Sequence, residues 1–152
     1  MDRHEEFMRE ALRMGRLGLA ADEVPVGAVA VENGAIVAAA YNAPVSRHDP
    51  TAHAEILALR QAAEKAGNYR LESVTLYCTL EPCAMCAGAL VAARVARLVF
   101  GTRDLRFGAV RSKFRLADSD LLNHRVEIVE GVLGLECVEL LRAFFKKKRM
   151  PC

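Results

Sequence analysis

His53-Ala54-Glu55 is followed, after 26 intervening residues, by Pro82-Cys83-Ala84-Met85-Cys86. One imidazole and two thiolates are ligands of the kind that Zn²⁺ binds in proteins. A structural zinc site normally has four protein ligands, whereas a catalytic site keeps one position for water. The two segments therefore predict a catalytic zinc centre, with His53, Cys83 and Cys86 as its ligands.

Both segments stand at the start of a predicted helix. One helix is expected from Thr51 or His53 to Ala66, and the other continues from Pro82 through Ala93, because proline is tolerated in a first turn. Residues three apart on a helix share a face, with Cβ atoms about 5–6 Å apart, so Cys83 and Cys86 suit one ion. The positive end of the helix dipole also favours their thiolate forms.

Glu55 is predicted to move protons rather than to bind the metal. Residues two apart on a helix point in nearly opposite directions, so Glu55 is not expected to join His53 as a ligand. Its longer side chain is expected to reach the water in the fourth position, whose pKa zinc lowers to about 7. Glu55 would accept a proton from that water and pass it to the substrate, releasing ammonia.

The same residues allow two interpretations without catalysis. A Cys-x-x-Cys pair can be redox active, but a redox pair does not account for His53 and Glu55. A structural zinc knuckle needs a fourth ligand at similar local spacing, and neither His48 nor His124 supplies one convincingly. The combined pattern therefore favours catalysis.

The rest of the chain alternates between strand-like and helix-like stretches. Alternation of this kind predicts an α/β protein, a three-layer α/β/α domain around a mixed sheet. A first helix is expected from Asp2 to about Leu19. A final amphipathic helix is indicated by the apolar residues Leu133, Cys137, Leu140, Leu141 and Phe144. Strands are expected at 26–31 and 35–40, on either side of the turn Asn33-Gly34, and at 74–78, 97–102 and 126–129. Residues 41–50 are expected to form a loop, and residues 105–123 are expected to be mostly loop with some helix.

Length and composition predict one domain, residues 1–152, with one core. The start of the chain is polar and acidic, unlike a signal peptide, and no apolar stretch reaches membrane-spanning length. Five cysteines form no even disulfide framework, which favours a reducing compartment and hence the cytoplasm. Cys78 and Cys137 follow apolar patterns and are expected to be buried, whereas Cys152 is expected to be exposed.

Basic side chains are concentrated in two places. Seven lie between Arg94 and Arg115 against the single acid Asp104, and a second run occupies residues 146–149. Clustered cations favour phosphate-bearing partners. Either run alone is compatible with a solvated surface, but both beside the zinc pattern favour RNA or DNA as the partner.

His-x-Glu followed by Pro-Cys-x-x-Cys is shared by zinc-dependent nucleobase deaminases in general. Further segments are more selective, and with them the chain resembles the bacterial tRNA-specific adenosine deaminases over nearly its whole length. These segments are Glu23–Val29, Tyr41-Asn42, Arg47–Glu55, Tyr69–Leu71, Thr79–Ala89, Phe100–Asp104 and Asn123–Ile128.

That resemblance implies a cytidine-deaminase-like fold with a mixed five-stranded sheet, one Zn²⁺ per subunit and a homodimer. It also implies conversion of adenosine to inosine at the wobble position of a tRNA-Arg anticodon, with zinc-bound hydroxide attacking C6. Carried over by motif, Glu55 is the proton shuttle, Asn42 contacts the flipped base, Val26 and Pro44 lie near the pocket, and Asp104 meets the ribose and backbone. The small residues Ala84–Ala89 would permit close packing at the dimer contact.

Two segments depart from the family pattern. Leu105-Arg106-Phe107 and Val110-Arg111-Ser112 are bulkier than the residues usual there, and Arg111 is expected either to add a phosphate contact or to be solvated. Two other functions stay open at this point. One is deamination of a free base or nucleoside, such as guanine or cytosine, and the other is a zinc-stabilised RNA-binding module without catalysis.

Overall fold

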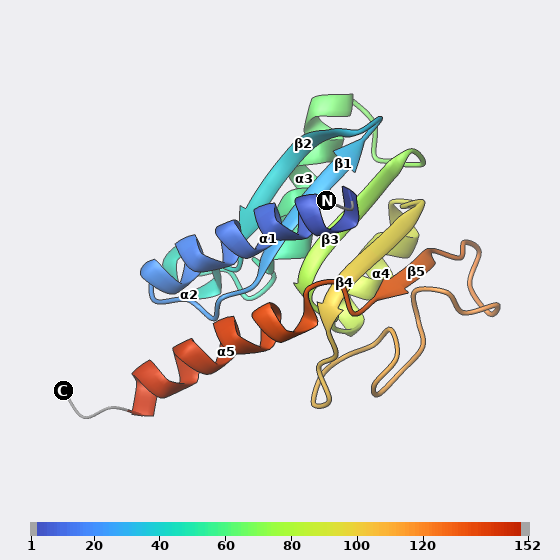
Figure 1. Ribbon diagram of the computed structural model, residues 1–152. Helices are drawn as coiled ribbons and strands as arrows, with labels where there is room; N and C mark the ends of the chain where they lie inside the picture. Colours follow the sequence, from blue (N-terminus) through green and yellow to red (C-terminus); the bar gives the residue numbers. More distant parts are fainter. Residues whose placement is uncertain (1–2, 150–152) are drawn as a thin grey trace.

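The computed structural model describes residues 3–149. A five-stranded mixed sheet forms the middle of three layers (Figure 1). In spatial order its strands are β2 (Ala35–Tyr41), β1 (Gly27–Glu32), β3 (Val74–Leu80), β4 (Arg97–Thr102) and β5 (Glu127–Glu130). β1 pairs antiparallel with β2 and β3, whereas β3, β4 and β5 run parallel. The predicted α/β class and mixed five-stranded sheet are confirmed.

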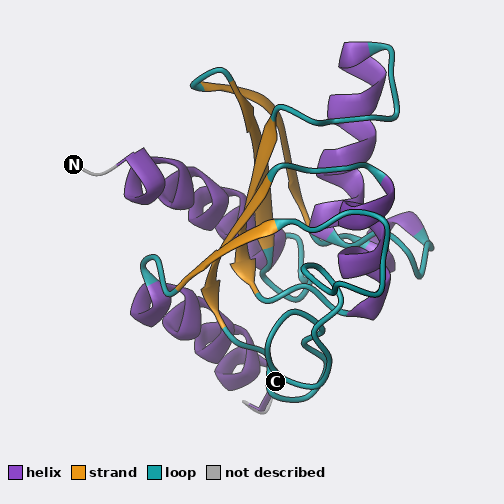
Figure 2. Ribbon diagram, turned by 90° about the vertical axis from the view of Figure 1, so that its right-hand side faces the viewer, coloured by secondary structure: helices purple, strands orange, loops and turns teal. Residues whose placement is uncertain are grey.

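Helices cover both faces of the sheet (Figure 2). The helices α1 (Arg3–Ala20) and α5 (Gly134–Arg149) lie on one face, where Met8, Val29 and Val99 are buried in a shared core. The helices α2 (Pro44–Arg47), α3 (Ala54–Ala66) and α4 (Ala84–Ala92) lie on the other face, over the larger core. Within residues 3–149, no helix combines the length and apolar character needed to cross a membrane.

Local sequence explains the antiparallel edge of the sheet. Asn33 and Gly34 both have positive φ, 52° and 77°, as a tight two-residue hairpin between β2 and β1 requires. At Gly27 an added Cβ would overlap the backbone oxygen of Ala11, so this glycine lets α1 lie directly against β1. The hairpin and the packed first helix set the position of the segment that leads from β2 into the candidate site.

Some boundaries differ from those predicted. The helix expected from Pro82 begins at Ala84, because its N-cap Cys83 is still extended, with φ −76° and ψ −179°. The Pro82 oxygen accepts a hydrogen bond from the Ala109 amide. The predicted loop 41–50 contains the single-turn helix α2, whose Val45 and Ser46 amides donate to the buried Glu23 carboxylate. Residues 105–123 contain no helix. The Asp2 start lies outside the described residues, as does Cys152.

Candidate active site

Three predicted ligands converge from the starts of two helices. His53 is the N-cap of α3, Cys83 is the N-cap of α4, and Cys86 lies in the first turn of α4. The ligand atoms of these three residues all lie within 4.8 Å of one another. No other histidine, cysteine or carboxylate within residues 3–149 belongs to this group. The structure thus brings together the three residues that the sequence analysis selected.

The distances between these atoms suit a zinc ion. His53 Nδ1 lies 3.6 Å from Cys83 Sγ and 3.5 Å from Cys86 Sγ. A nitrogen and a sulfur at ordinary zinc-ligand distances, separated by the tetrahedral angle, are about 3.6 Å apart. The cluster therefore fits a tetrahedral cation that is bound through His53 Nδ1 and both thiolates, with a fourth position left for another ligand.

The two cysteines can supply negative charge to a cation. Hydrogen bonding with Cys86 lowers the pKa of the Cys83 thiol to about 3; burial opposes the shift, and His53 adds to it. The same pairing, together with burial, raises the pKa of Cys86. Both residues also face the positive end of α4, which favours thiolate. At least one anionic sulfur is therefore available at neutral pH.

Glu55 lies beside this cluster without belonging to it. The residue is only 4% exposed, and burial raises the pKa of its carboxyl group, while the nearby His53 opposes the shift. A raised pKa brings a carboxyl group closer to the range in which a general acid–base catalyst exchanges protons most readily.

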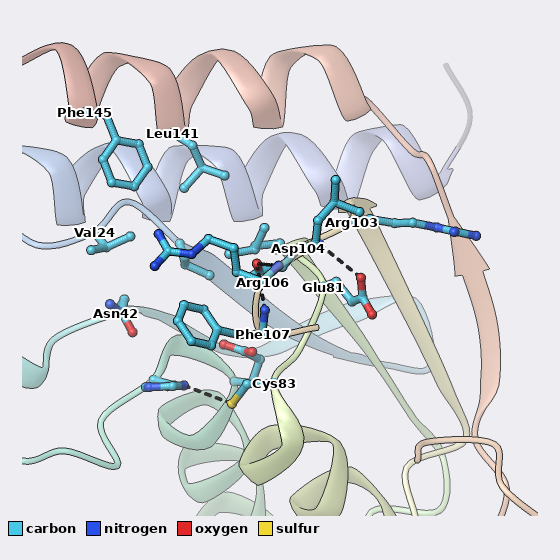
Figure 3. Close-up of a pocket in the computed structure, with 15 residues that line it drawn as sticks. Val24, Asn42, Glu81, Cys83, Arg103, Asp104, Arg106, Phe107, Leu141 and Phe145 are labelled. Atoms are coloured by element: carbon cyan, nitrogen blue, oxygen red, sulfur yellow. Dashed lines mark hydrogen bonds between the residues drawn. The ribbon is translucent and has the colours of Figure 1, made fainter. Parts of the chain in front are cut away.

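A cavity of about 750 Å³ opens above the cluster (Figure 3). Of the predicted substrate-binding residues, Val26, Asn42 and Asp104 line it, as do His53, Glu55 and Cys83. Pro44 is not among the lining residues and instead begins α2. The other lining residues are Val24, Leu80, Glu81, Arg103, Leu105, Arg106, Phe107, Leu141 and Phe145. Apolar atoms form most of the cavity wall, and polar or charged side chains such as Asn42, Glu55 and Asp104 stand among them, as is usual for a small-molecule or nucleobase site.

Comparison with known proteins identifies the family. The family model described as MafB19-like deaminase matches residues 2–149. The chain is 47% identical to the tRNA-specific adenosine deaminase of Haemophilus influenzae over 146 residues, which cover 95% of this chain and 84% of that protein. The chain belongs to the tRNA-specific adenosine deaminase family. The resemblance drawn from the motifs is thereby confirmed.

Solved structures support the same assignment of the deaminase fold. One comes from studies of A-to-I editing by tRNA:A34 deaminases at the wobble position; it matches with a TM-score of 0.86 at 41% identity, over 89% of this chain and 98% of that one. A guanine deaminase from Nitrosomonas europaea matches with a TM-score of 0.81 at 29% identity, over 92% and 83% of the two chains. The architecture is thus common to deaminases with different substrates.

The sequence analysis missed the residue that holds one wall of this deaminase cavity. Glu81 is a carboxylate only 2% exposed, and it accepts hydrogen bonds from the amides of Asp104 (3.0 Å) and Arg111 (2.7 Å). The Val110 amide and both the amide and hydroxyl of Ser112 donate to it as well. Burial raises the pKa of Glu81, but these hydrogen bonds outweigh it and leave the pKa below its ordinary value. The feature of the sequence that could have indicated a role for Glu81 is its position directly before Pro82 and Cys83.

Arg111 is not solvated, which was one of the two alternatives expected for it. Its guanidinium forms a two-pronged ion pair with Asp118, with both contacts at 3.0 Å, and donates to the Val110 oxygen. The side chain is only 15% exposed, so it is neither solvated nor directed toward the cavity. Arg111 instead closes the loop between residues 110 and 118. His124, left uncertain by the sequence, donates through Nε2 to the Val95 oxygen and is also structural.

Many cations of the two basic runs are paired within the chain. Arg97 pairs with Glu127 and Arg103 with Glu130 across β4 and β5, and Lys147 and Lys148 contact Asp22. Arg106, at the cavity, has no ion pair within residues 3–149. Arg106 is therefore one cation of the first run that lines the cavity and is available to an anionic ligand.

Proposed function

We propose that this protein deaminates adenosine to inosine at the wobble position of a tRNA anticodon, with a tRNA-Arg as the expected substrate. The observation that carries the proposal is the three-ligand cluster beside buried Glu55 at the base of the cavity, in a chain 47% identical to a tRNA-specific adenosine deaminase. Residues 1–152 would form one deaminase domain that acts in the cytoplasm on tRNA.

The proposed cofactor is one Zn²⁺ per subunit. His53 Nδ1, Cys83 Sγ and Cys86 Sγ would hold it, since their spacing and thiolate chemistry fit this ion. When bound, zinc supplies Lewis acidity that makes water a competent nucleophile near neutral pH. Three protein ligands leave room for that water, which distinguishes this cluster from a four-ligand structural site.

Glu55 is the proposed proton carrier. The reaction forms a C6–O bond and breaks the C6–N bond to the exocyclic amine. Glu55 would take a proton from the attacking water, deliver one to the ring nitrogen, and assist departure of the amine as ammonia. Its burial beside the ligand cluster supports this role, because a desolvated carboxyl group holds a proton more readily than an exposed one.

Asn42, Val26 and Asp104 are the proposed substrate contacts. An amide side chain offers both donors and an acceptor, so Asn42 can match the polar edge of an extruded base, and Val26 supplies an apolar contact. Asp104 would meet the ribose and backbone. Pro44, two residues after Asn42, would restrict the segment that carries this amide. A loop nucleotide is already partly unstacked, so its extrusion into the cavity costs little.

The second candidate is deamination of a free base, because a guanine deaminase shares the fold. The assay that separates the candidates uses purified protein with an anticodon stem-loop, free adenosine, guanine and cytosine as parallel substrates. We expect inosine in the stem-loop, no reaction of a base-paired adenosine, and binding that weakens steeply as salt rises. Faster turnover of guanine or cytosine, with little salt dependence, would replace the tRNA proposal by the free-base one.

A homodimer is also proposed, on the basis of the family resemblance. The exposed residues of α4 include Ala84, Met85 and Gly88, which lie on one side of this helix and include two of the smallest side chains. Small residues at such a face allow two backbones to approach closely.

A further inference from the structure

An exposed aromatic ring stands at the mouth of the cavity. Phe107 is 62% exposed, yet it lines the same cavity as Glu55 and Cys83. In Figure 3 its ring lies between Asn42 and Cys83, next to the space where the proposed reaction takes place. The proposed mechanism and substrate contacts use Glu55, Asn42 and Asp104 and give Phe107 no role. An aromatic ring that is exposed and also lines a cavity can offer its face to a ligand bound there.

The backbone of Phe107 is held from within the protein. The amides of Arg106 (3.1 Å) and Phe107 (3.2 Å) both donate to Asp104 Oδ1. The Asp104 amide in turn donates to the buried Glu81 carboxylate. The ring is therefore presented by a loop that is fixed to the core, and ordering it on ligand binding costs less than ordering a free loop.

A cation accompanies the ring. The Arg106 guanidinium lies 5.2 Å from the centroid of the Phe107 ring, within the range of a cation–π contact. Arg106 also lines the cavity, and in Figure 3 its side chain extends across the cavity in the direction of Val24. Within the described chain its charge is not neutralised by any carboxylate. An aromatic face beside an available positive charge is the combination that binds a base together with its phosphate.

We infer that Phe107 is a substrate-binding residue that stacks on the extruded adenine, while Arg106 faces the adjoining phosphate. The inference rests on the proposed function and adds to it a contact that the motif residues do not include. An extruded base loses its stacking partners in the anticodon loop, and the Phe107 ring replaces one of them. The contact would favour a base presented in RNA, because a free base has no phosphate for Arg106.

The test compares Phe107 with a matched control. Phe114 is similarly exposed, at 59%, and stands further along the same connection, but it does not line the cavity. F107A, F107L, F107Y and F114A are each combined with E55A, and binding is measured to two stem-loops. One carries the wobble adenosine and the other has an abasic site at that position. Melting curves check that each variant is folded.

We expect F107A to weaken binding of the intact stem-loop by about 5- to 150-fold, the range for loss of one aromatic–base stack. F107L should bind as poorly as F107A, F107Y should restore binding, and F114A should have no effect. With the abasic stem-loop, F107A should bind as tightly as its parent. Equal weakening of both stem-loops by F107A, or no weakening at all, would overturn the inference.

A separate assay measures the proposed reaction independently of the stacking contact. The protein with Glu55 intact is assayed for inosine in the same stem-loop, and failure there counts against the reaction, whatever the binding series shows. In that assay, F107A should lower kcat/KM mainly through a higher KM. Inosine formation by the unaltered protein together with unchanged binding by F107A would retain the function and reject the stacking contact.

Discussion

The Asp104 amide donates a 3.0 Å hydrogen bond to Glu81 Oε1, although the two residues are 23 positions apart. Glu81 directly precedes Pro82 and Cys83, whose backbones meet the same loop: the Ala109 amide donates to the Pro82 oxygen, and Cys83 forms an isolated bridge with Gly108. One short segment therefore positions both a proposed metal ligand and the loop that lines the substrate cavity.

Replacing Glu81 tests this arrangement. In E81Q the side-chain nitrogen would face backbone donors, and leaving them unsatisfied should cost about 1–3 kcal/mol of unfolding free energy. We expect a higher KM for the stem-loop, a smaller change in kcat, and unchanged zinc content. The control is E23Q, which alters a carboxylate that is equally buried but holds α2. A similar rise in KM for both variants would show that the effect is not specific to the loop.

The Glu81 carboxylate should also make stability depend on pH. Its pKa in the folded protein lies below the ordinary value of 4.5, so the ionised form stabilises the fold at higher pH. This contribution is fully present above 4.5 and is lost as the pH falls from there through the lower folded pKa. Urea unfolding at several pH values should therefore show the difference between the wild type and E81Q shrinking below 4.5. A difference independent of pH would contradict this role.

The sequence predicted the elements and the ligand cluster because both follow from local patterns. His53, Cys83 and Cys86 stand at helix starts that can be recognised from their neighbours, and Asn33-Gly34 marks its hairpin. Residues 105–123 lack such periodicity, since their conformation is set by hydrogen bonds to Glu81, which is distant in the sequence. For the same reason the inward ion pair of Arg111 was not foreseen. This ion pair depends on the fold of the loop that brings Asp118 beside Arg111, and not on the residues next to Arg111 in the sequence.

Removing a metal ligand should abolish zinc binding. We expect C83A, C86A and H53A each to lose stoichiometric zinc and activity, because two remaining ligands hold the ion much less tightly. The matched control is C137A, which removes a buried thiol from the opposite face of the sheet. Metal analysis of the purified variants provides the measurement. Full zinc content in C86A, or loss of zinc in C137A, would contradict the proposed ligand set.

Enlarging Gly88 tests the proposed dimer contact. Apart from its chain neighbours and the backbone of its own helix, no atom of residues 3–149 lies within 4 Å of a Cβ added at Gly88, so G88R should leave the fold of the subunit intact. If α4 packs against a second subunit, the arginine should shift the protein toward monomer. Analytical ultracentrifugation measures the shift, and a melting curve checks the fold. A G88R protein that stays dimeric would place the contact elsewhere.

Removing the acid–base function of Glu55 should separate chemistry from binding. E55Q keeps the size of the side chain but cannot carry the proton, so turnover should fall by about 10²- to 10⁴-fold. Zinc content and affinity for the stem-loop should stay near those of the wild type, because Glu55 lies outside the ligand cluster. If E55Q kept wild-type turnover, the proposed role of Glu55 as proton carrier would be wrong. If E55Q lost its zinc, Glu55 would instead be a metal ligand.

The most direct measurement is mass spectrometry of an anticodon stem-loop after reaction in water enriched in ¹⁸O. Hydrolytic deamination replaces the amine of the wobble adenosine by oxygen from solvent, so the inosine formed there should contain one ¹⁸O atom. Inosine should be confined to that position and should be absent after zinc is removed with a chelator. An unmodified wobble adenosine after exhaustive reaction with zinc-loaded protein, or inosine without the solvent label, would contradict the account.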